Sequence, residues 1–221
     1  MPKCLIKRLI EKSGDDMKNE TGKREKLIMS AIGLFAEYGY DKVSIRQIAA
    51  DAGVNSSMIS YYFNGKGGLY EAIIKELLHN FDKFFADIET DKVDPREALK
   101  LYIHIISDIH RKYPPHFVKL IYREMLNPTE IFENIAISKL RSNVSVLLKI
   151  VEHGKKLGIF RSDLDKEKIL LMFVSVINFY FLVMPLHSKI IEQDEAFCSN
   201  YLTQVLDIFF NGIEVKGHDK T

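Results

Sequence analysis

The fold is decided by the stretch Ser44-Ile45-Arg46-Gln47-Ile48-Ala49-Ala50-Asp51-Ala52-Gly53-Val54-Asn55-Ser56-Ser57-Met58-Ile59-Ser60-Tyr61-Tyr62-Phe63. It is too short for two independent helices, and Gly53, followed by Asn55 and Ser56, interrupts it too clearly for a single helix. Ser44 and Gln47 have the spacing of a capping box, in which each side chain accepts a hydrogen bond from the other residue's backbone N–H. The stretch therefore predicts a helix-turn-helix.

Gly53 marks the turn between the two short helices. A left-handed residue is needed where a helix ends in a sharp turn, and glycine adopts that conformation without a steric penalty. Either Asn55 or Ser56 is then expected to cap the second helix. Helical spacing defines the buried faces, which comprise Ile45, Ile48, Ala49 and Ala52 in the first helix and Ile59, Tyr62 and Phe63 in the second.

The second predicted helix directs small hydroxyl groups and one tyrosine outward. Such side chains fit close to base edges in a major groove and form hydrogen bonds with them. A solvated face on an ordinary helical hairpin explains the same pattern. The residues alone leave both interpretations open for Ser56, Ser57, Ser60 and Tyr61.

A longer region carries a family resemblance. The phrase Leu34-Phe35-Ala36-Glu37-Tyr38-Gly39-Tyr40, within the segment 24–40, resembles the first helix of the TetR family of transcriptional regulators. The stretch 44–53 and the ending Tyr62-Phe63-Asn64-Gly65-Lys66, followed by Leu69, are also similar to that family. Roughly forty-five residues match in order and spacing, which is more specific than a lone short motif.

The resemblance implies DNA-binding roles for Ser44, Arg46, Ser56, Ser57, Tyr61, Tyr62 and Lys66. The first two would meet phosphate or a base edge, the next three would enter the major groove, and the last two would hold phosphates. Lys66 also lies at the predicted start of the next helix, where free N–H groups favour an anion. The sequence departs from the family pattern at Ser60 and at the pair 67–68.

The charge distribution agrees only weakly with a nucleic-acid partner. The first 66 residues contain 11 Lys+Arg and 8 Asp+Glu, a net charge of +3, whereas the remaining residues contain 20 and 22, a net charge of −2. Because this asymmetry is small, attraction to phosphate must come from placed groups and helix termini more than from total charge.

Helical periodicity continues beyond Lys66 without strand-like alternation. One apolar face from Leu69 to Phe85 predicts a helix of about five turns. Asp94 and Pro95 are expected to start the next helix. The segment 113–115 should end that helix, and Thr129 should cap a later long helix.

We therefore expect an all-α protein in which a long helix joins an N-terminal three-helix helix-turn-helix head to a C-terminal helical body. The expected divisions are an N-terminal extension (1–22), a DNA-binding domain (23–68) and an effector-binding and dimerisation domain (69–221). The extension is interpreted either as a mobile or loosely helical tail or as a basic arm that contacts DNA.

The segment 169–186 is the most apolar part of the chain, and its length alone would suit a membrane span. Ser175, Asn178 and Tyr180 interrupt it, and Pro185 ends it. We expect burial between two subunits instead, with the last two helices of each copy forming a four-helix interface, as the resemblance implies. The matching stripe on the last helix comprises Phe197, Tyr201, Leu202, Val205, Ile208 and Phe209. Such a homodimer would read a palindromic operator.

The body is expected to offer an effector cavity. The chosen ligand-binding candidates are Tyr102, His104, Tyr122, Asn178 and Phe181, drawn from a wider set that adds Phe84, Ile105, Phe117, Ile121 and Tyr180. Most of these residues are expected to pack in the core, because aromatic residues at helical spacing pack more often than they bind a ligand. Asn178 is the sharpest candidate because a buried amide needs partners. Arg123 and Glu124 could fix a charged group, pair with each other or face water.

No catalytic motif supports an enzyme. The segment 65–68 lacks the first glycine and the hydroxyl of a phosphate loop. The histidines show no His-Glu-x-x-His spacing, so no metal or cofactor is expected. The only cysteines, Cys4 and Cys198, are not paired in sequence, which favours a reducing cytoplasm. The expected function is a DNA-binding repressor released by a small lipophilic or aromatic effector; the alternative is a DNA-bound module whose body docks another protein.

Overall fold

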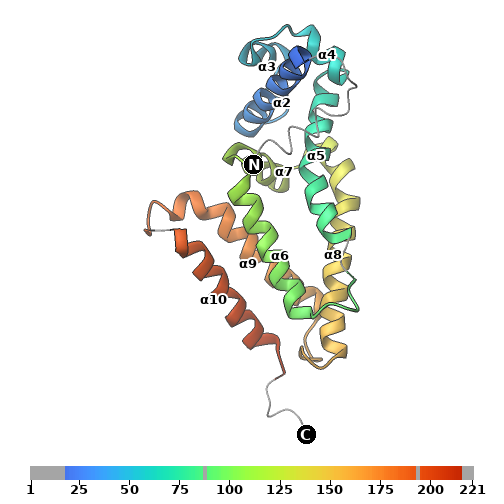
Figure 1. The fold of residues 1–221 in the computed structure, drawn as a ribbon, viewed down its shortest axis with the longest axis vertical. Coiled ribbons are helices and arrows are strands. Elements are labelled where there is room, and N and C mark those ends of the chain that lie inside the picture. Colours follow the sequence, from blue (N-terminus) through green and yellow to red (C-terminus); the bar gives the residue numbers. More distant parts are fainter. Residues whose placement is uncertain (1–17, 87–88, 193–194, 216–221) are drawn as a thin grey trace. The chain divides into compact units, whose positions relative to one another are not determined.

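The computed structural model describes residues 18–86, 89–192 and 195–215 (Figure 1). Residues 1–17 of the predicted extension, and the side chains of Phe84 and Cys198, lie outside this description. The described chain is helical apart from turns and one isolated antiparallel bridge between Phe160 and Glu214. The predicted all-α class is confirmed.

The described helices follow one another with short connections. They are α2 (Lys18–Tyr38), α3 (Ile45–Ala52), α4 (Ser57–Phe63), α5 (Lys66–Ala86), α6 (Pro95–Lys112), α7 (Pro115–Leu126), α8 (Glu130–Lys156), α9 (Lys166–His187) and α10 (Glu195–Ile213). The first helix thus begins six residues before the segment 24–40, which resembles the first helix of the family.

The helices form two compact units. The N-terminal unit comprises residues 1–86 and 109–141, and the C-terminal unit comprises residues 87–108 and 142–221. Most of α6 and the second half of α8 belong to the C-terminal unit, so these two helices contribute to both. The predicted functional division at residue 68 remains a prediction.

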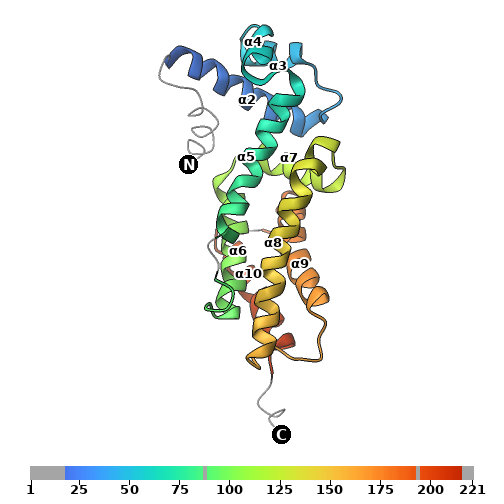
Figure 2. The ribbon, with the colours of Figure 1, turned by 90° about the vertical axis from the view of Figure 1, so that its right-hand side faces the viewer.

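In the N-terminal unit, α2 packs against α3 and α7, and α4 packs against α5 (Figure 2). Apolar side chains from all these helices share one core, which includes Leu27, Ile28, Phe35, Ile48, Ile59, Leu69, Tyr70, Ile73, Phe117 and Leu120. This continuous core fixes the helix-turn-helix on α5 and α7.

Three side chains start long helices. Oδ1 of Asp94 accepts from the Arg96 N–H at 2.8 Å, ahead of Pro95, and Oγ1 of Thr129 accepts from the Phe132 N–H at 3.2 Å. Both predicted starts are therefore present. Asp165 caps α9 by accepting from the Lys168 N–H at 2.9 Å, so this helix begins ahead of the apolar segment 169–186.

In the C-terminal unit, α9 and α10 run in opposite directions (Figure 1) and contact each other through aromatic rings. Phe173 lies 4.8 Å from Phe209, measured between ring centroids. Tyr180 stacks on Tyr201 at 4.3 Å. The buried side of α9 comprises Ile169, Leu170, Phe173, Ile177, Tyr180 and Phe181.

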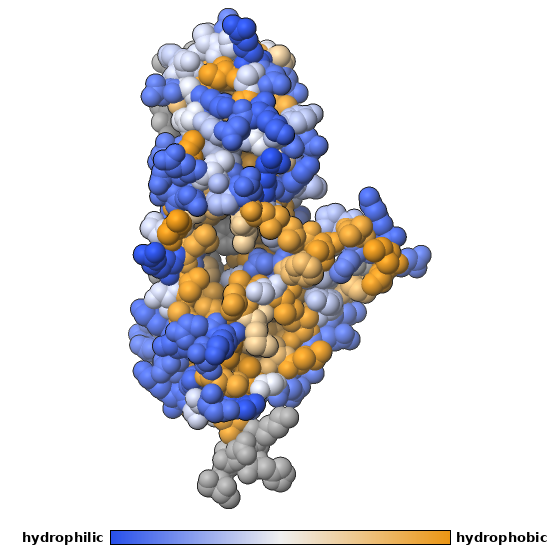
Figure 3. All heavy atoms as spheres, turned by 180° about the vertical axis from the view of Figure 1, so that it is seen from behind, coloured by the Kyte–Doolittle hydropathy of each residue, from blue (hydrophilic) through white to orange (hydrophobic). Residues whose placement is uncertain are grey.

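The other side of α9 is apolar and exposed, and Figure 3 shows apolar side chains, in orange, gathered on one face of the molecule. The exposed residues of α9 include Met172, Phe179 and Leu186. By length and composition α9 could cross a membrane, and 33% of its most apolar stretch of 18 residues is buried. In the single chain, α9 therefore buries one face, and the expected burial of its other face against a second subunit stays a prediction.

Candidate nucleic-acid interface

The capping box that starts α3 is present. Oγ of Ser44 accepts from the Gln47 N–H at 3.2 Å, and Oε1 of Gln47 accepts from the Ser44 N–H at 2.8 Å. The Ser44 hydroxyl also donates to the same Gln47 oxygen at 2.8 Å. Because this donor is used within the box, the residue fixes the helix start and offers DNA only its remaining acceptor capacity.

Gly53 ends α3 in the left-handed conformation, with φ of 66°. Its N–H donates to Ala50 O at 3.2 Å, and the Val54 N–H donates to Ala49 O at 3.0 Å. These bonds satisfy carbonyl groups at the end of α3 and turn the chain sharply. The turn sets the direction of α4.

Asn55 caps α4. Its Oδ1 accepts from the backbone N–H of Ser57 at 2.9 Å and from the Ser57 hydroxyl at 2.8 Å. Ser56 makes no capping bond through its side chain. Of the two predicted caps, Asn55 is therefore the residue whose side chain caps the helix. Its bond to the Ser57 hydroxyl also fixes the orientation of that side chain.

The predicted recognition residues differ in exposure. Tyr61 is 72% exposed, and Ser57 and Ser60 are exposed beside it, whereas Ser56 is half-buried. Tyr62 is half-buried, and its ring lies edge-on to Tyr61 at 5.1 Å. The open face of α4 is thus built from two hydroxyls and a phenol, groups that suit base edges.

Arg46 lies exposed in the first turn of α3. Within the described part of the chain it forms no hydrogen bond or ion pair, so its guanidinium is available for a phosphate or a base edge. Lys66 is different. Its ammonium donates to the carbonyls of Tyr40 and Val43, each at 3.0 Å, and lies 4.2 Å from the Tyr40 ring centroid.

Lys66 was predicted to hold a phosphate, but its ammonium group already bonds to two backbone carbonyls. Two of its three donors hold the turn between α2 and α3, which leaves one donor for a phosphate. Arg24, which the sequence did not single out, lies over the Phe63 ring at 4.9 Å. Partial burial lowers the pKa of the Arg24 guanidinium, although Tyr62 opposes that shift.

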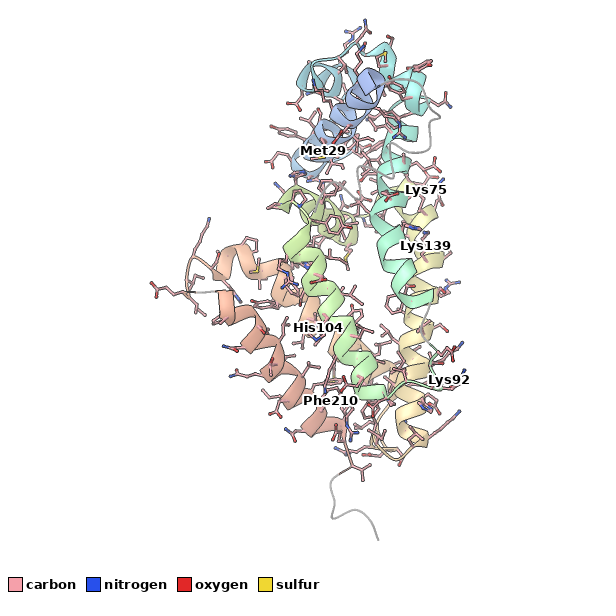
Figure 4. The ribbon with its side chains drawn as sticks, viewed as in Figure 1. Met29, Lys75, Lys92, His104, Lys139 and Phe210 are labelled. Carbon is pink, nitrogen blue, oxygen red and sulfur yellow. The ribbon has the colours of Figure 1, made fainter. Side chains whose placement is uncertain are left out.

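The five ligand candidates do not all share one unit. In the C-terminal unit, Nδ2 of Asn178 donates to Val174 O at 2.8 Å and to Tyr102 Oη at 3.3 Å. Burial raises the pKa of Tyr102, although the Asn178 bond opposes that shift, and Phe181 is buried one turn along α9. Asn178 itself is half-buried. His104, on α6 in Figure 4, is exposed and so does not belong to this cluster, contrary to expectation.

Tyr122 lies in the N-terminal unit, where its hydroxyl is 3.0 Å from Nε2 of His110. Glu124 is buried, and its carboxylate accepts from Tyr70 Oη at 2.5 Å and from the Thr129 N–H at 2.9 Å. Arg123 donates to Tyr38 O at 3.4 Å. Arg123 and Glu124 thus bond to residues of the segments around α7 and not to each other.

Two family models match the chain. Residues 27–73 match the model described as bacterial regulatory proteins of the tetR family, and residues 95–200 match the model of the tetracyclin repressor-like C-terminal domain. The chain belongs to the TetR family. Together the matches cover the helix-turn-helix and most of the body, so this TetR-family protein is a DNA-binding transcriptional regulator rather than an enzyme.

Curated relatives of this TetR-family regulator are bacterial regulators as well. It is 31% identical to the probable HTH-type transcriptional regulator YttP of Bacillus subtilis over 60% of its own length and 65% of that protein. It is 27% identical to the HTH-type transcriptional repressor NicS of Pseudomonas putida over 86% of its own length and 92% of that protein.

Solved structures share the fold of the regulator. The ketosteroid transcriptional regulator KstR2 of Mycobacterium tuberculosis matches with a TM-score of 0.68 and 19% identity, over 92% of this chain and 99% of that one. The fatty acid degradation regulator FadR of Bacillus halodurans matches with a TM-score of 0.64 and 18% identity, over 90% of this chain and 98% of that one. At these identities the likeness concerns the fold alone.

Proposed function

We propose that this regulator is a cytoplasmic, dimeric repressor that occupies a palindromic operator and leaves it when a small lipophilic or aromatic effector binds. The observation that carries the proposal is the exposed polar face of α4, in which Asn55 orients Ser57 and Tyr61 is 72% exposed. A helix of this kind reads only a few base pairs, so two copies are needed to read an operator.

The exposed face of α9 supports dimerisation. Met172, Val176, Phe179, Val183 and Leu186 are spaced alternately four and three residues apart, the repeat with which helices pack along a shared seam. All but Val183 are at least 45% exposed in the single chain. A second copy would bury this face, and a two-fold axis would place the same residues on both sides.

The chemistry of the effector is inferred from the body and from the names of similar proteins. The pairing of Asn178 with Tyr102 sets neutral polar groups among apolar side chains of the C-terminal unit. This composition suits a lipophilic molecule with few polar atoms. The solved structures of similar fold include regulators named for ketosteroids and for fatty acid degradation.

Contacts within the N-terminal unit give a route for the response. Lys119 of α7 pairs with Glu37 of α2, and Glu124 of α7 accepts from Tyr70 of α5. Since α7 is thus bonded to α2 of the head and to α5, which follows the head, a displacement of α7 would move the head. An effector produces this response only if it binds the two states of the body with unequal affinity.

The alternative is that the body docks another protein and binds no effector. The connection between α9 and α10 exposes two large apolar side chains, Ile190 (71%) and Ile191 (51%), which would suit such a contact. The two functions differ in what releases the protein from DNA.

A footprint tests the repressor proposal. The purified full chain is incubated with DNA that flanks its own coding region, and protection of two half-sites about one helical turn apart, or a near multiple, is expected. Long-chain fatty acyl compounds and steroid ketones are then added. Loss of protection with one of these classes supports an effector, whereas protection that persists with all of them supports the docking alternative.

A further inference from the structure

A hollow of about 380 Å³ lies between the beginning of α2 and the turn that joins α3 to α4. The described residues that line it are Gly22, Lys23, Lys26, Gly53, Val54, Asn55 and Met58. The backbone leaves it open, because a Cβ atom built on Gly22 or Gly53 would meet no atom within 4 Å. We refer to it as the α2 hollow.

The α2 hollow is positively charged. Lys23 and Lys26 are both exposed and lie three residues apart on α2, which places them on one face of the helix. None of the described lining residues is acidic. Two like charges on one helix face repel each other, and an anion bound between them would remove that repulsion.

Asn55 adds a neutral donor to the two ammonium groups. Its Oδ1 is occupied by the backbone N–H and the hydroxyl of Ser57. The amide nitrogen of the same side chain therefore keeps its two N–H groups for another partner. The α2 hollow thus combines two cations with an oriented amide donor, a set that matches the oxygens of a phosphate group.

We propose that the α2 hollow binds one phosphate of the DNA backbone, next to the groove that α4 enters. This inference rests on the proposed DNA-binding function and adds three contacts to it, from Lys23, Lys26 and Asn55. Asn55 belongs to the hollow and also orients Ser57 of the exposed face. A phosphate held here would therefore fix the position of α4 along the duplex.

The test uses the full chain and a duplex of arbitrary sequence, because phosphate contacts do not depend on sequence. The affinities of the parent, Lys23→Ala/Lys26→Ala and the charge-matched control Lys149→Ala/Lys189→Ala are measured over a range of salt concentrations. Lys149 and Lys189 are exposed and lie in the C-terminal unit. Circular dichroism checks that all three proteins have the same helical content and melting temperature.

We expect the Lys23→Ala/Lys26→Ala variant to bind more weakly and its log–log salt slope to fall by about 0.9 for each head that contacts the duplex. The control should keep the parent slope. Equal slopes for the parent and both variants would overturn the proposal that the α2 hollow binds a DNA phosphate. The footprint, and with it the repressor proposal, would be unaffected.

A second arm separates DNA phosphate from free phosphate. Inorganic phosphate is titrated at constant ionic strength in the absence of DNA. Chemical-shift changes confined to residues 22–26 and 53–58, saturating at millimolar phosphate, absent from the double variant and accompanied by an unchanged salt slope, would show that the hollow takes a free anion and would overturn its assignment to the duplex backbone. Absence of saturation, together with the reduced salt slope, supports the duplex backbone as the ligand.

Discussion

The hydroxyl of Tyr70 donates to a carboxylate oxygen of Glu124 at 2.5 Å and so joins α5 to α7 inside the N-terminal unit. Both side chains are buried, and the other carboxylate oxygen accepts from the N–H and the hydroxyl of Thr129. Burial, followed by the bond to Glu124, raises the pKa of Tyr70, which keeps its proton available for donation. This network holds α5, α7 and the start of α8 together.

Replacing Tyr70 by Phe should lower the free energy of unfolding by about 1–3 kcal/mol, because a buried carboxylate oxygen loses its donor. Urea denaturation measures the change. The matched control is Tyr38→Phe, at a ring that is 53% exposed, which should change stability by less than about 0.5 kcal/mol. Equal stabilities for the two variants would mean that the bond between Tyr70 and Glu124 contributes nothing.

Lys66→Met should also destabilise the protein, by about 1–2 kcal/mol, because the carbonyls of Tyr40 and Val43 lose a charged donor. Methionine keeps the apolar stem beside the Tyr40 ring. Lys42→Met, at an exposed lysine of the same turn, is the control. Thermal melting separates this stability effect from any loss of DNA affinity, and an unchanged melting temperature would show that these contacts do not stabilise the turn.

Ile208→Lys should convert a dimer into a folded monomer. Ile208 is 72% exposed on α10, so a charge there costs nothing in the isolated chain but would be buried in the proposed interface. Phe209→Lys is the contrasting variant, since Phe209 packs against Phe173 and should unfold the C-terminal unit. Sedimentation equilibrium measures the oligomeric state, and circular dichroism measures whether the variant is folded. An Ile208→Lys protein that stays dimeric would show that Ile208 of α10 is not buried in the interface.

His116 should make stability depend on pH. Burial lowers its pKa below the usual 6.5, so between these two values the unfolded chain binds more protons than the folded chain. Stability therefore decreases as the pH falls below about 6.5. The His116→Gln variant should show a weaker decrease than the parent in melting scans at successive pH values. The exposed His79→Gln variant should follow the parent, and an identical decrease in all three proteins would contradict the role of His116.

Local signals predicted much of the fold, because a few residues determine where a helix starts or stops. Asp94 and Pro95 start α6, and Gly53 ends α3 with a positive φ. In each case the deciding contacts lie within a few residues of one another along the chain. The choice between Asn55 and Ser56 required the structure, since both can cap a helix.

Contacts between distant residues were not predictable from sequence. Lys66 bonds to carbonyls 26 and 23 residues away, and Tyr70 bonds to Glu124 over 54 residues. The phosphate role of Lys66 was expected from family resemblance and from its place at a helix start, and neither indicates these partners. His104 is a different case, because helical geometry already places it about 200° around α6 from Tyr102 and thus away from the buried side.

If the exposed face of α4 reads DNA sequence, the side chain of Tyr61 should contribute to sequence preference. The parent and Tyr61→Ala are therefore compared on the footprinted site and on an arbitrary duplex. Because Tyr61 is 72% exposed, its removal should leave the melting temperature unchanged. We expect Tyr61→Ala to bind the arbitrary duplex as the parent does and to lose most of the preference for the footprinted site. A folded Tyr61→Ala protein with the full preference of the parent would contradict this expectation.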